Sequence, residues 1–250
     1  FQEAGTMSDD VRTRLFLDEA GNERISTSDR ETMDVARVLR MRPNHRVVFF
    51  KNDPFDYEYT LQEMNRRELV FQYEGRKPNT ANPHVPCLLI QAAGKTGKNE
   101  EIVRHGTALG VTDFLFFQAD RSIGRIAFEK LARLRKIAIE SCRQCGRSVL
   151  PAIEARNENL QTSLQYADRL PVIAFSPNAK TSFYQVRREE FSNGAALVVG
   201  PEGGFSPEEQ KTLEEKAVHL VGLGPRTLRM ELASVAALAL VQSLLIETET

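Results

Sequence analysis

The sequence predicts an α/β protein with a mostly parallel sheet, preceded by a smaller β-rich domain. From residue 87 onward, short apolar runs alternate with helical patterns, which is typical of a parallel sheet with helices on both faces. Before residue 75, short runs rich in aromatic and β-branched residues indicate strands. With 250 residues, 41% of them hydrophobic, the chain can bury one large core or two modest ones.

The N-terminal part is expected to form a small β domain over residues 8–78. Residues 1–7 are expected to be a tag remnant followed by the start Met7, and not part of this domain. The predicted strands are Val47–Lys51, Tyr57–Leu61 and Glu68–Tyr73. Proline, glycine and asparagine then concentrate between Gly75 and Pro86, so residues 79–86 are predicted to be a linker.

Residues 87–250 are expected to form the α/β domain. Its predicted strands are Cys87–Gln91, Asp113–Phe117, Val149–Ile153, Pro171–Phe175, Ala195–Val199 and Val218–Val221. Its predicted helices are Glu100–Leu109, Arg125–Cys145, Asn157–Asp168, Ser206–Lys216 and Met230–Ile246. The last helix combines small and bulky apolar residues, which fits either an internal core helix or a subunit interface.

A glycine-dense loop follows the predicted strand Ala195–Val199. Gly200, Gly203 and Gly204 allow positive φ angles and close approach of the backbone to a ligand. Ser206 and Glu209 then form a capping box at a helix start. Strand-end loops of this kind bind ligands in α/β proteins, although a tight turn without a ligand has the same pattern.

A second loop of the same kind runs from Leu223 to Glu231. Arg229 and Glu231 lie at the entrance to an otherwise apolar helix. Glu231 alone could simply favour the helix N-terminus, with Arg229 as a solvated neighbour. Two glycine-bearing loops in one domain could instead enclose a single ligand.

Basic residues concentrate in one part of a chain whose net charge is −1. The stretch Arg121–Arg147 holds eight basic residues and only two acidic ones, which favours a phosphate-binding surface over a solvated helix face. Arginines near the N-terminus repeat this theme among acidic residues. The residues that we predict to bind RNA are Arg12, Arg14, Arg37, Arg40, Arg42, Lys95, Lys98, Arg143 and Arg147.

Several other classes of protein are disfavoured. Gly94-Lys95-Thr96 resembles the end of a P-loop, but that motif needs a glycine where Leu89 stands. Cys142 and Cys145 lack a second pair, so we predict no metal site. Three cysteines make no disulfide framework, which indicates the cytoplasm. The run Leu232–Val241 is too short to span a membrane.

With both loops considered, the chain resembles the RsmE family, the 16S rRNA (uracil(1498)-N(3))-methyltransferases of the SPOUT superfamily. The resemblance rests on Val199–Ser206 and Leu223–Glu231. Arg37–Met41, Leu109-Gly110-Val111 and Gln144–Arg147 support it. It extends over nearly the whole chain from about residue 11. One departure is Leu232, which takes the place of the threonine that usually follows the motif's glutamate.

The resemblance implies a PUA-like β-barrel for the RNA-binding N-terminal domain and a SPOUT-type domain with a trefoil knot. It implies a homodimer, acting on 16S rRNA of the small ribosomal subunit, with S-adenosylmethionine as cofactor. The residues that would bind the cofactor are Phe175, Ser176, Pro177, Val199, Gly200, Pro201, Glu202, Gly203, Gly204, Phe205, Leu223, Gly224, Pro225, Leu228 and Leu232.

For catalysis, Arg229 is expected to stabilise charge on a uracil carbonyl oxygen. Glu231 is expected to orient Arg229 rather than to accept the N3 proton, because an ordinary glutamate with a pKa near 4.3 is a weak base for an imide. Two alternatives remain from the sequence. The chain could methylate another RNA site, or it could be an RNA-binding protein that has lost catalysis, with Leu232 as the suspect feature.

Overall fold

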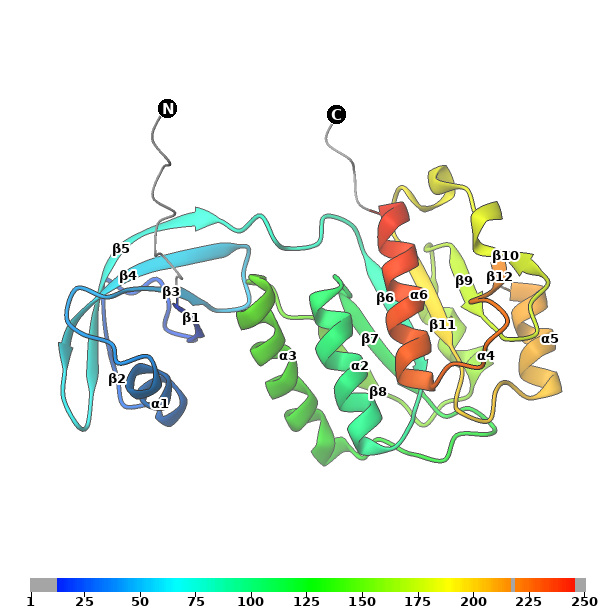
Figure 1. The fold of residues 1–250 in the computed structure, drawn as a ribbon, viewed down its shortest axis with the longest axis horizontal. Coiled ribbons are helices and arrows are strands. Elements are labelled where there is room, and N and C mark those ends of the chain that lie inside the picture. The colour runs from blue at the N-terminus through cyan, green and yellow to red at the C-terminus, as the bar shows by residue number, and fades with distance from the viewer. Residues whose placement is uncertain (1–12, 217–218, 246–250) are drawn as a thin grey trace, which may run out of the picture. The chain divides into compact units, whose positions relative to one another are not determined.

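The structure, a computed structural model, describes residues 13–216 and 219–245 (Figure 1). Predictions on residues 1–7, Arg12, Val218 and Ile246 therefore lie outside the described residues. The chain divides into two compact units. Unit 1 contains the described residues up to Ala81 and also the short segment Gly146–Val149. Unit 2 contains Asn82–Cys145 and the described residues from Leu150 onward.

Unit 1 is built on a five-stranded sheet with the order β1-β3-β4-β5-β2. Its elements are β1 (Thr13–Phe16), β2 (Arg24–Thr27), α1 (Arg30–Val38), β3 (Arg46–Phe50), β4 (Phe55–Met64) and β5 (Leu69–Pro78). Strands β1 and β3 are parallel, whereas the other neighbours are antiparallel. The predicted strands therefore exist, and β1, β2 and α1 are additions that the sequence analysis missed.

The core of unit 1 consists mainly of aromatic side chains. The ring of Phe49 packs edge-on against Tyr59 and Phe71, at centroid distances of 5.2 and 5.0 Å. All three side chains are fully buried. Large rings in this arrangement contribute both buried area and a favourable edge-to-face interaction. Asp29 caps the N-terminus of helix α1, since its carboxylate accepts a hydrogen bond from the Thr32 amide at 2.8 Å.

Unit 2 is built on a seven-stranded sheet with the order β10-β12-β9-β11-β6-β7-β8. Its strands are β6 (Cys87–Ala92), β7 (Asp113–Phe117), β8 (Ala152–Ala155), β9 (Val172–Phe175), β10 (Thr181–Ser182), β11 (Ala195–Val199) and β12 (His219–Gly222). Every neighbouring pair is parallel. The predicted α/β fold with a mostly parallel sheet is thus confirmed.

Helices cover both faces of this sheet. The longer helices are α2 (Thr96–Ala108), α3 (Leu131–Cys145), α5 (Pro207–Lys216) and α6 (Met230–Leu245), and α4 (Leu160–Ser163) is a single turn. The described residues of the unit also form the short 3-10 helices η1 (Phe128–Lys130), η2 (Leu164–Ala167), η3 (Phe183–Gln185) and η4 (Arg188–Phe191).

Alternate strand residues belong to different cores. Leu89 and Leu197 pack with α2, α3 and α6, which Figure 1 shows side by side. Their neighbours Ile90 and Val198 pack instead with α4 and α5. Strands β6 and β11 are therefore apolar along almost their whole length, because helices cover both faces of the parallel sheet.

Several predicted elements have different bounds in the structure, and α2, for example, begins at Thr96 rather than at Glu100. The expected strand Val149–Ile153 begins only after Pro151, because proline cannot donate to a strand ladder. The expected helix Arg125–Cys145 is an α-helix only from Leu131, and the residues directly before it, Phe128–Lys130, form the 3-10 helix η1. The third expected helix, Asn157–Asp168, breaks into α4 and η2. Among the helices described, none is both long and apolar enough to cross a membrane.

Candidate active site

The predicted site loops all follow strands of the unit 2 sheet at the same edge. Val199, at the end of β11, pairs in register with Gln91 of β6 and with Phe175 of β9. Phe175 pairs in turn with Val221 of β12. The four strands therefore end at nearly one level, and the loops that follow them are neighbours. This edge is where parallel α/β sheets bind their ligands.

The glycine loop after β11 has the geometry that its residues suggested. Gly204 has a φ of +69°, and its amide donates to the Pro201 carbonyl at 3.0 Å. A Cβ at Gly200 would lie 3.0 Å from the Phe205 ring, so the ring packs directly against the main chain of Gly200. Glu202 and Gly203 are exposed as residues beside this turn, although the Glu202 side chain itself is only 20% exposed. The loop thus presents main chain and one carboxylate at the edge of the sheet.

The predicted capping box is confirmed and has a further function. The Ser206 amide donates to Glu209 Oε2 at 2.8 Å, and the Glu209 amide donates back to Ser206 Oγ at 3.2 Å. The other Glu209 oxygen accepts from the Asp120 amide at 3.1 Å. Arg121 donates to the Gly203 carbonyl at 3.2 Å. The start of α5 therefore anchors the loop after β7 as well as its own.

The loop after β12 leads directly into α6. Gly224 has a φ of +101°, which favours glycine there. Leu223 and Leu228 are partly buried, whereas Pro225 is exposed and the Leu232 side chain is 52% exposed. The Arg229 carbonyl accepts the Ala233 amide at 2.8 Å, but within the described ranges its exposed guanidinium makes no hydrogen bond or ion pair. Arg229 is therefore available to a substrate.

The two motif loops are joined by Lys98 in the first turn of α2. Its Nζ lies 3.1 Å from Glu202 Oε1 and 3.4 Å from Glu231 Oε2. We call these three residues the Lys98 cluster. The hydrogen bond to Glu202 is the main cause that raises the pKa of Lys98 above its ordinary value, so the ammonium stays charged. All three side chains are at most 29% exposed.

This geometry differs from two predictions. Glu231 was expected to orient Arg229, but the charged group that it contacts is Lys98. Lys98 was expected to bind RNA, but its ammonium is engaged by the two glutamates. Both differences have one cause: α2 starts at Thr96, which brings Lys98 to the edge of the sheet where the motif loops lie.

The sequence analysis also missed buried polar residues that hold the site loops. Ser234 of α6 donates to Gln91 Oε1 at 2.6 Å, and both side chains are fully buried. Asn99 bonds both the amide and the carbonyl of Gly94, at 3.0 and 2.9 Å. The sequence held one signal for the Ser234–Gln91 pair: Gln91 is a polar residue within the otherwise apolar run Cys87–Ala92 and needs a buried partner. These bonds fix α6 and the loop after β6 against the sheet.

The remaining predicted cofactor residues divide by exposure. Phe175 and Ser176 are buried, and the Ser176 amide donates to the Val221 carbonyl at 3.0 Å. Pro177, which follows them, is exposed. Among the described residues, no group of three or more histidine, cysteine, aspartate or glutamate side chains is placed to hold a metal ion.

Apart from Arg12, which lies outside the described residues, and Lys98, the predicted RNA-binding residues fall into three groups. Arg37, Arg40, Arg42 and Lys95 are exposed. Arg143 is partly buried and pairs with Glu140 at 2.6 Å. Arg14 and Arg147 are largely withdrawn from solvent, since the Arg14 side chain is 14% exposed and Arg147 is 2% exposed. The burial of these two arginines removes the exposure that a contact with RNA phosphates would require.

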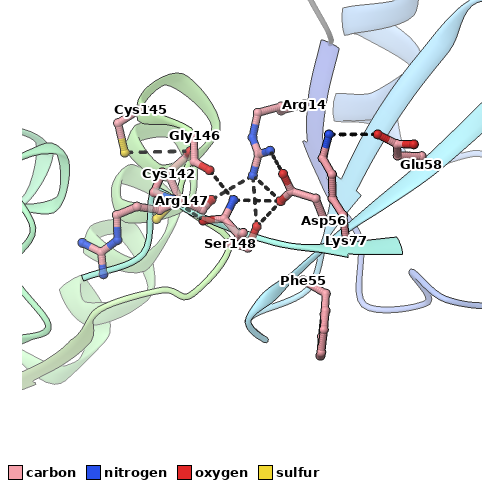
Figure 2. A network of polar contacts seen from close by, with 12 residues as sticks. Arg14, Phe55, Asp56, Glu58, Lys77, Cys142, Cys145, Gly146, Arg147 and Ser148 are labelled. Atoms are coloured by element: carbon pink, nitrogen blue, oxygen red, sulfur yellow. Dashed lines mark hydrogen bonds and ion pairs between the residues drawn. The ribbon is translucent and has the colours of Figure 1, made fainter. Parts of the chain in front are cut away.

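The burial of Arg14 has a structural cause, which Figure 2 shows. Asp56 accepts two hydrogen bonds from Arg14, at 2.7 and 3.0 Å, one from Asn79 at 2.9 Å and one from the Ser148 hydroxyl. We call these four residues the Asp56 cluster. Arg14 and Asn79 also donate to the carbonyls of Arg147 and Gly146, at 3.2 and 2.7 Å. The cluster thus fixes Gly146–Val149 within unit 1.

Burial by itself would raise the pKa of Asp56. The hydrogen bonds from Arg14, Ser148 and Asn79, with the charge of Arg14, outweigh that effect and hold the pKa below its usual value. Asp56 is therefore a carboxylate at neutral pH. A buried carboxylate that accepts four hydrogen bonds has a structural role at neutral pH.

Comparison with known proteins identifies the family. A sequence pattern described as an RNA methyltransferase domain matches residues 81–242. Ribosomal RNA small subunit methyltransferase E of Bacillus subtilis is 29% identical over 91% of this chain and 92% of its own. The enzyme of the same description from Helicobacter pylori strain J99 is 30% identical over 68% of this chain and 73% of its own.

Solved structures agree with these sequence matches. A ribosomal RNA small subunit methyltransferase E from Neisseria gonorrhoeae, bound to S-adenosylmethionine, superposes with a TM-score of 0.81. It is 25% identical, and the match covers 94% of this chain and 98% of that one. The predicted family and enzyme class are therefore confirmed. The chain belongs to the ribosomal RNA small subunit methyltransferase E family.

Proposed function

We propose that this protein transfers a methyl group from S-adenosylmethionine to N3 of a uracil in 16S rRNA, giving 3-methyluridine at the position numbered 1498 in its family. The observation that carries the proposal is the meeting of two glycine-bearing loops, after β11 and β12, at one edge of a parallel sheet. The cofactor and the rRNA substrate follow from the relatives of the same family.

The residues present fit a cofactor of this kind. Exposed main chain at Glu202–Gly203 and a positive-φ glycine at Gly224 allow a bulky ligand to approach the backbone. In the Lys98 cluster two carboxylates face one ammonium, and this excess of negative charge suits a cation. When bound, the cofactor supplies an electrophilic methyl group on a positively charged sulfur.

For the reaction, the protein's part is mainly to position the uracil and to stabilise charge. Arg229 is proposed as the catalytic residue, because its guanidinium is exposed and has no partner among the residues that the structure describes. It would stabilise the negative charge that develops on a uracil carbonyl oxygen as N3 becomes nucleophilic. Glu231 is proposed to act at the cofactor side of the site, since it contacts Lys98 rather than Arg229.

We further propose a trefoil knot in unit 2 and a PUA-like, RNA-binding role for unit 1. The close crossing of segments at Gly94 supports the knot: a Cβ there would lie 2.2 Å from the Met230 side chain, and Gly124 packs on its carbonyl. The exposed arginines of α1 and of the turn that follows it, Arg37, Arg40 and Arg42, support the RNA-binding role. The exposed basic residues of α3 would extend the RNA surface within unit 2.

The proposal includes a homodimer in the bacterial cytoplasm, where the ribosomal substrate is assembled. Its support is the small-residue content of α6, which the sequence pattern leaves equally compatible with a core helix. A measurement of mass in solution by light scattering tests this part. A monomer at the concentrations used for the assay would contradict it.

The function itself is tested by methyl transfer. The purified protein, labelled S-adenosylmethionine and small ribosomal subunits from cells lacking their own enzyme are incubated, and the rRNA is digested to nucleosides. We expect labelled 3-methyluridine. A different methylated nucleoside would favour another RNA site. Cofactor binding without transfer would favour a protein that has lost catalysis, and Leu232 would then be the first residue to restore to threonine.

A further inference from the structure

We infer that Lys98 is a positioning residue for the reaction: its ammonium holds the loop after β11 and the start of α6 in the arrangement that binds the cofactor. The inference rests on the proposed function, because it concerns the same site. Neither motif contains Lys98, which comes from a third element, α2. Its role is to act through Glu202 and Glu231 rather than on the reacting atoms.

The position of Lys98 is unfavourable for the helix that carries it. The N-terminus of a helix has a partial positive charge and favours acidic side chains, with each charge there contributing about 0.3–1 kcal/mol. The first turn of α2 contains no acidic residue, and Lys98 is the third residue of the helix. A charge placed against the helix dipole indicates that the surrounding structure requires it.

What surrounds the ammonium is a pair of carboxylates from two separate loops. Glu202 lies in the turn after β11, and Glu231 is the second residue of α6. Each has one oxygen within 3.4 Å of the same nitrogen. Oε2 of Glu231 is buried, and in the described residues it accepts no hydrogen bond of ordinary geometry, so Lys98 is the charge that balances it.

Without Lys98, two like charges would remain close together in a half-buried site. Their repulsion and the burial of Glu231 would favour separation of the two loops. Both loops are anchored elsewhere, by the capping box at Glu209 and by the Ser234–Gln91 bond. The fold should therefore persist while the spacing of the loops changes, and cofactor affinity should respond before stability does.

The test uses the full chain and compares Lys98→Met, Lys98→Arg and Lys211→Met. Methionine keeps most of the side chain's volume but removes the charge. Lys211 is a matched control, since it is exposed on α5 and its ion pair among the described residues is with Glu215 at 4.0 Å. Calorimetric titration gives the Kd of S-adenosylmethionine, methyl transfer gives kcat and the KM for ribosomal subunits, and thermal melting gives Tm.

We expect Lys98→Met to raise the cofactor Kd by about tenfold or more, with the KM for ribosomal subunits unchanged within about twofold. Lys98→Arg should restore most of the affinity, and Lys211→Met should not change it. In a double-mutant cycle, Glu202→Gln should cost much less in the Lys98→Met background than in the wild type, because the two residues act together.

Three results would overturn the inference. One is a cofactor Kd that stays unchanged in Lys98→Met, whether or not Tm falls. Another is a rise in the KM for ribosomal subunits alone, which would make Lys98 an RNA contact. The third is strict additivity of Lys98→Met and Glu202→Gln. If the wild-type protein itself fails to bind the cofactor, the proposed function fails instead, so the two failures are distinguishable.

Discussion

Replacing Asp56 by asparagine removes the negative charge at the centre of the Asp56 cluster while keeping the size of the side chain. The carboxylate accepts two hydrogen bonds from Arg14 and one each from Asn79 and Ser148. An amide offers one oxygen and directs an NH2 group at donors. The substitution therefore leaves the Arg14 guanidinium without its balancing charge, in a position where the side chain is 14% exposed.

Breaking a buried ion pair by removing one partner costs about 3–5 kcal/mol. The lower end applies here, because Arg14 keeps its hydrogen bonds to the Arg147 carbonyl and the Ser148 hydroxyl. About 3 kcal/mol corresponds to a fall in Tm of about 6–12 °C for a protein of this size. Asp34→Asn is the control, since the ion pairs of Asp34 with Arg30 and Arg37, the ones it forms in the described part of the chain, are exposed. Such pairs contribute about 0–1 kcal/mol.

The stability difference between Asp56→Asn and the wild type depends on pH, and its sign follows from the direction of the Asp56 pKa shift. The folded-state pKa of Asp56 lies below its unfolded value near 3.8, so the stabilisation is fully present above that value. It is lost as the pH falls through the folded-state pKa. Thermal melts at pH 7 should therefore separate Asp56→Asn from the wild type, and the separation should shrink as the pH falls below 3.8 and vanish below the folded-state pKa. Equal Tm losses for Asp56→Asn and Asp34→Asn at pH 7 would refute this reasoning.

Three further variants test the site of unit 2. Arg229→Ala should abolish methyl transfer while changing the cofactor Kd by less than about tenfold, and a larger loss of affinity by titration would make Arg229 a cofactor-binding residue. Ser234→Ala should lower the stability measured by urea unfolding by about 1–3 kcal/mol, because Gln91 Oε1 loses its buried donor; a loss within 0.5 kcal/mol would count against that bond. Gly124→Ala should cost about 1–3 kcal/mol or more in the same assay, since its Cβ would lie 1.9 Å from the Gly94 carbonyl oxygen, and a neutral result would contradict that packing.

The strands of unit 2 were predictable where an apolar run in the sequence is also a strand buried on both faces in the fold. Asp113–Phe117 and Ala195–Val199 have the predicted bounds because each is an apolar run that is buried on both faces and ends at polar or glycine residues. In unit 1, β1 and β2 have four residues each and contain arginine. They become strands through pairing with β3 and β5, and no pattern within four residues reveals such partners.

The site was predictable to a similar extent and for a similar reason. Glycine spacing and the capping box are local signals, and both loops lie where they indicated. The Lys98 cluster and the bond from Asp120 to Glu209 join residues that are far apart in the sequence. These contacts depend on which strands are neighbours in the sheet, and that order, with β11 between β9 and β6, is a property of the folded chain.

The segment Gly146–Val149 changes what counts as a separable domain in this protein. The chain leaves unit 1 after Ala81, re-enters it at Gly146 and leaves it again after Val149, so three covalent connections join the units instead of one. A fragment that stops at Ala81 would lack Ser148 and expose the carboxylate of Asp56 to solvent on that side. A chain starting at Asn82 would carry four residues whose binding site has been removed. Proteolysis at a single site near residue 81 would accordingly leave two fragments that remain associated through Gly146–Val149, and exchange of the N-terminal unit between relatives would require the exchange of this segment with it.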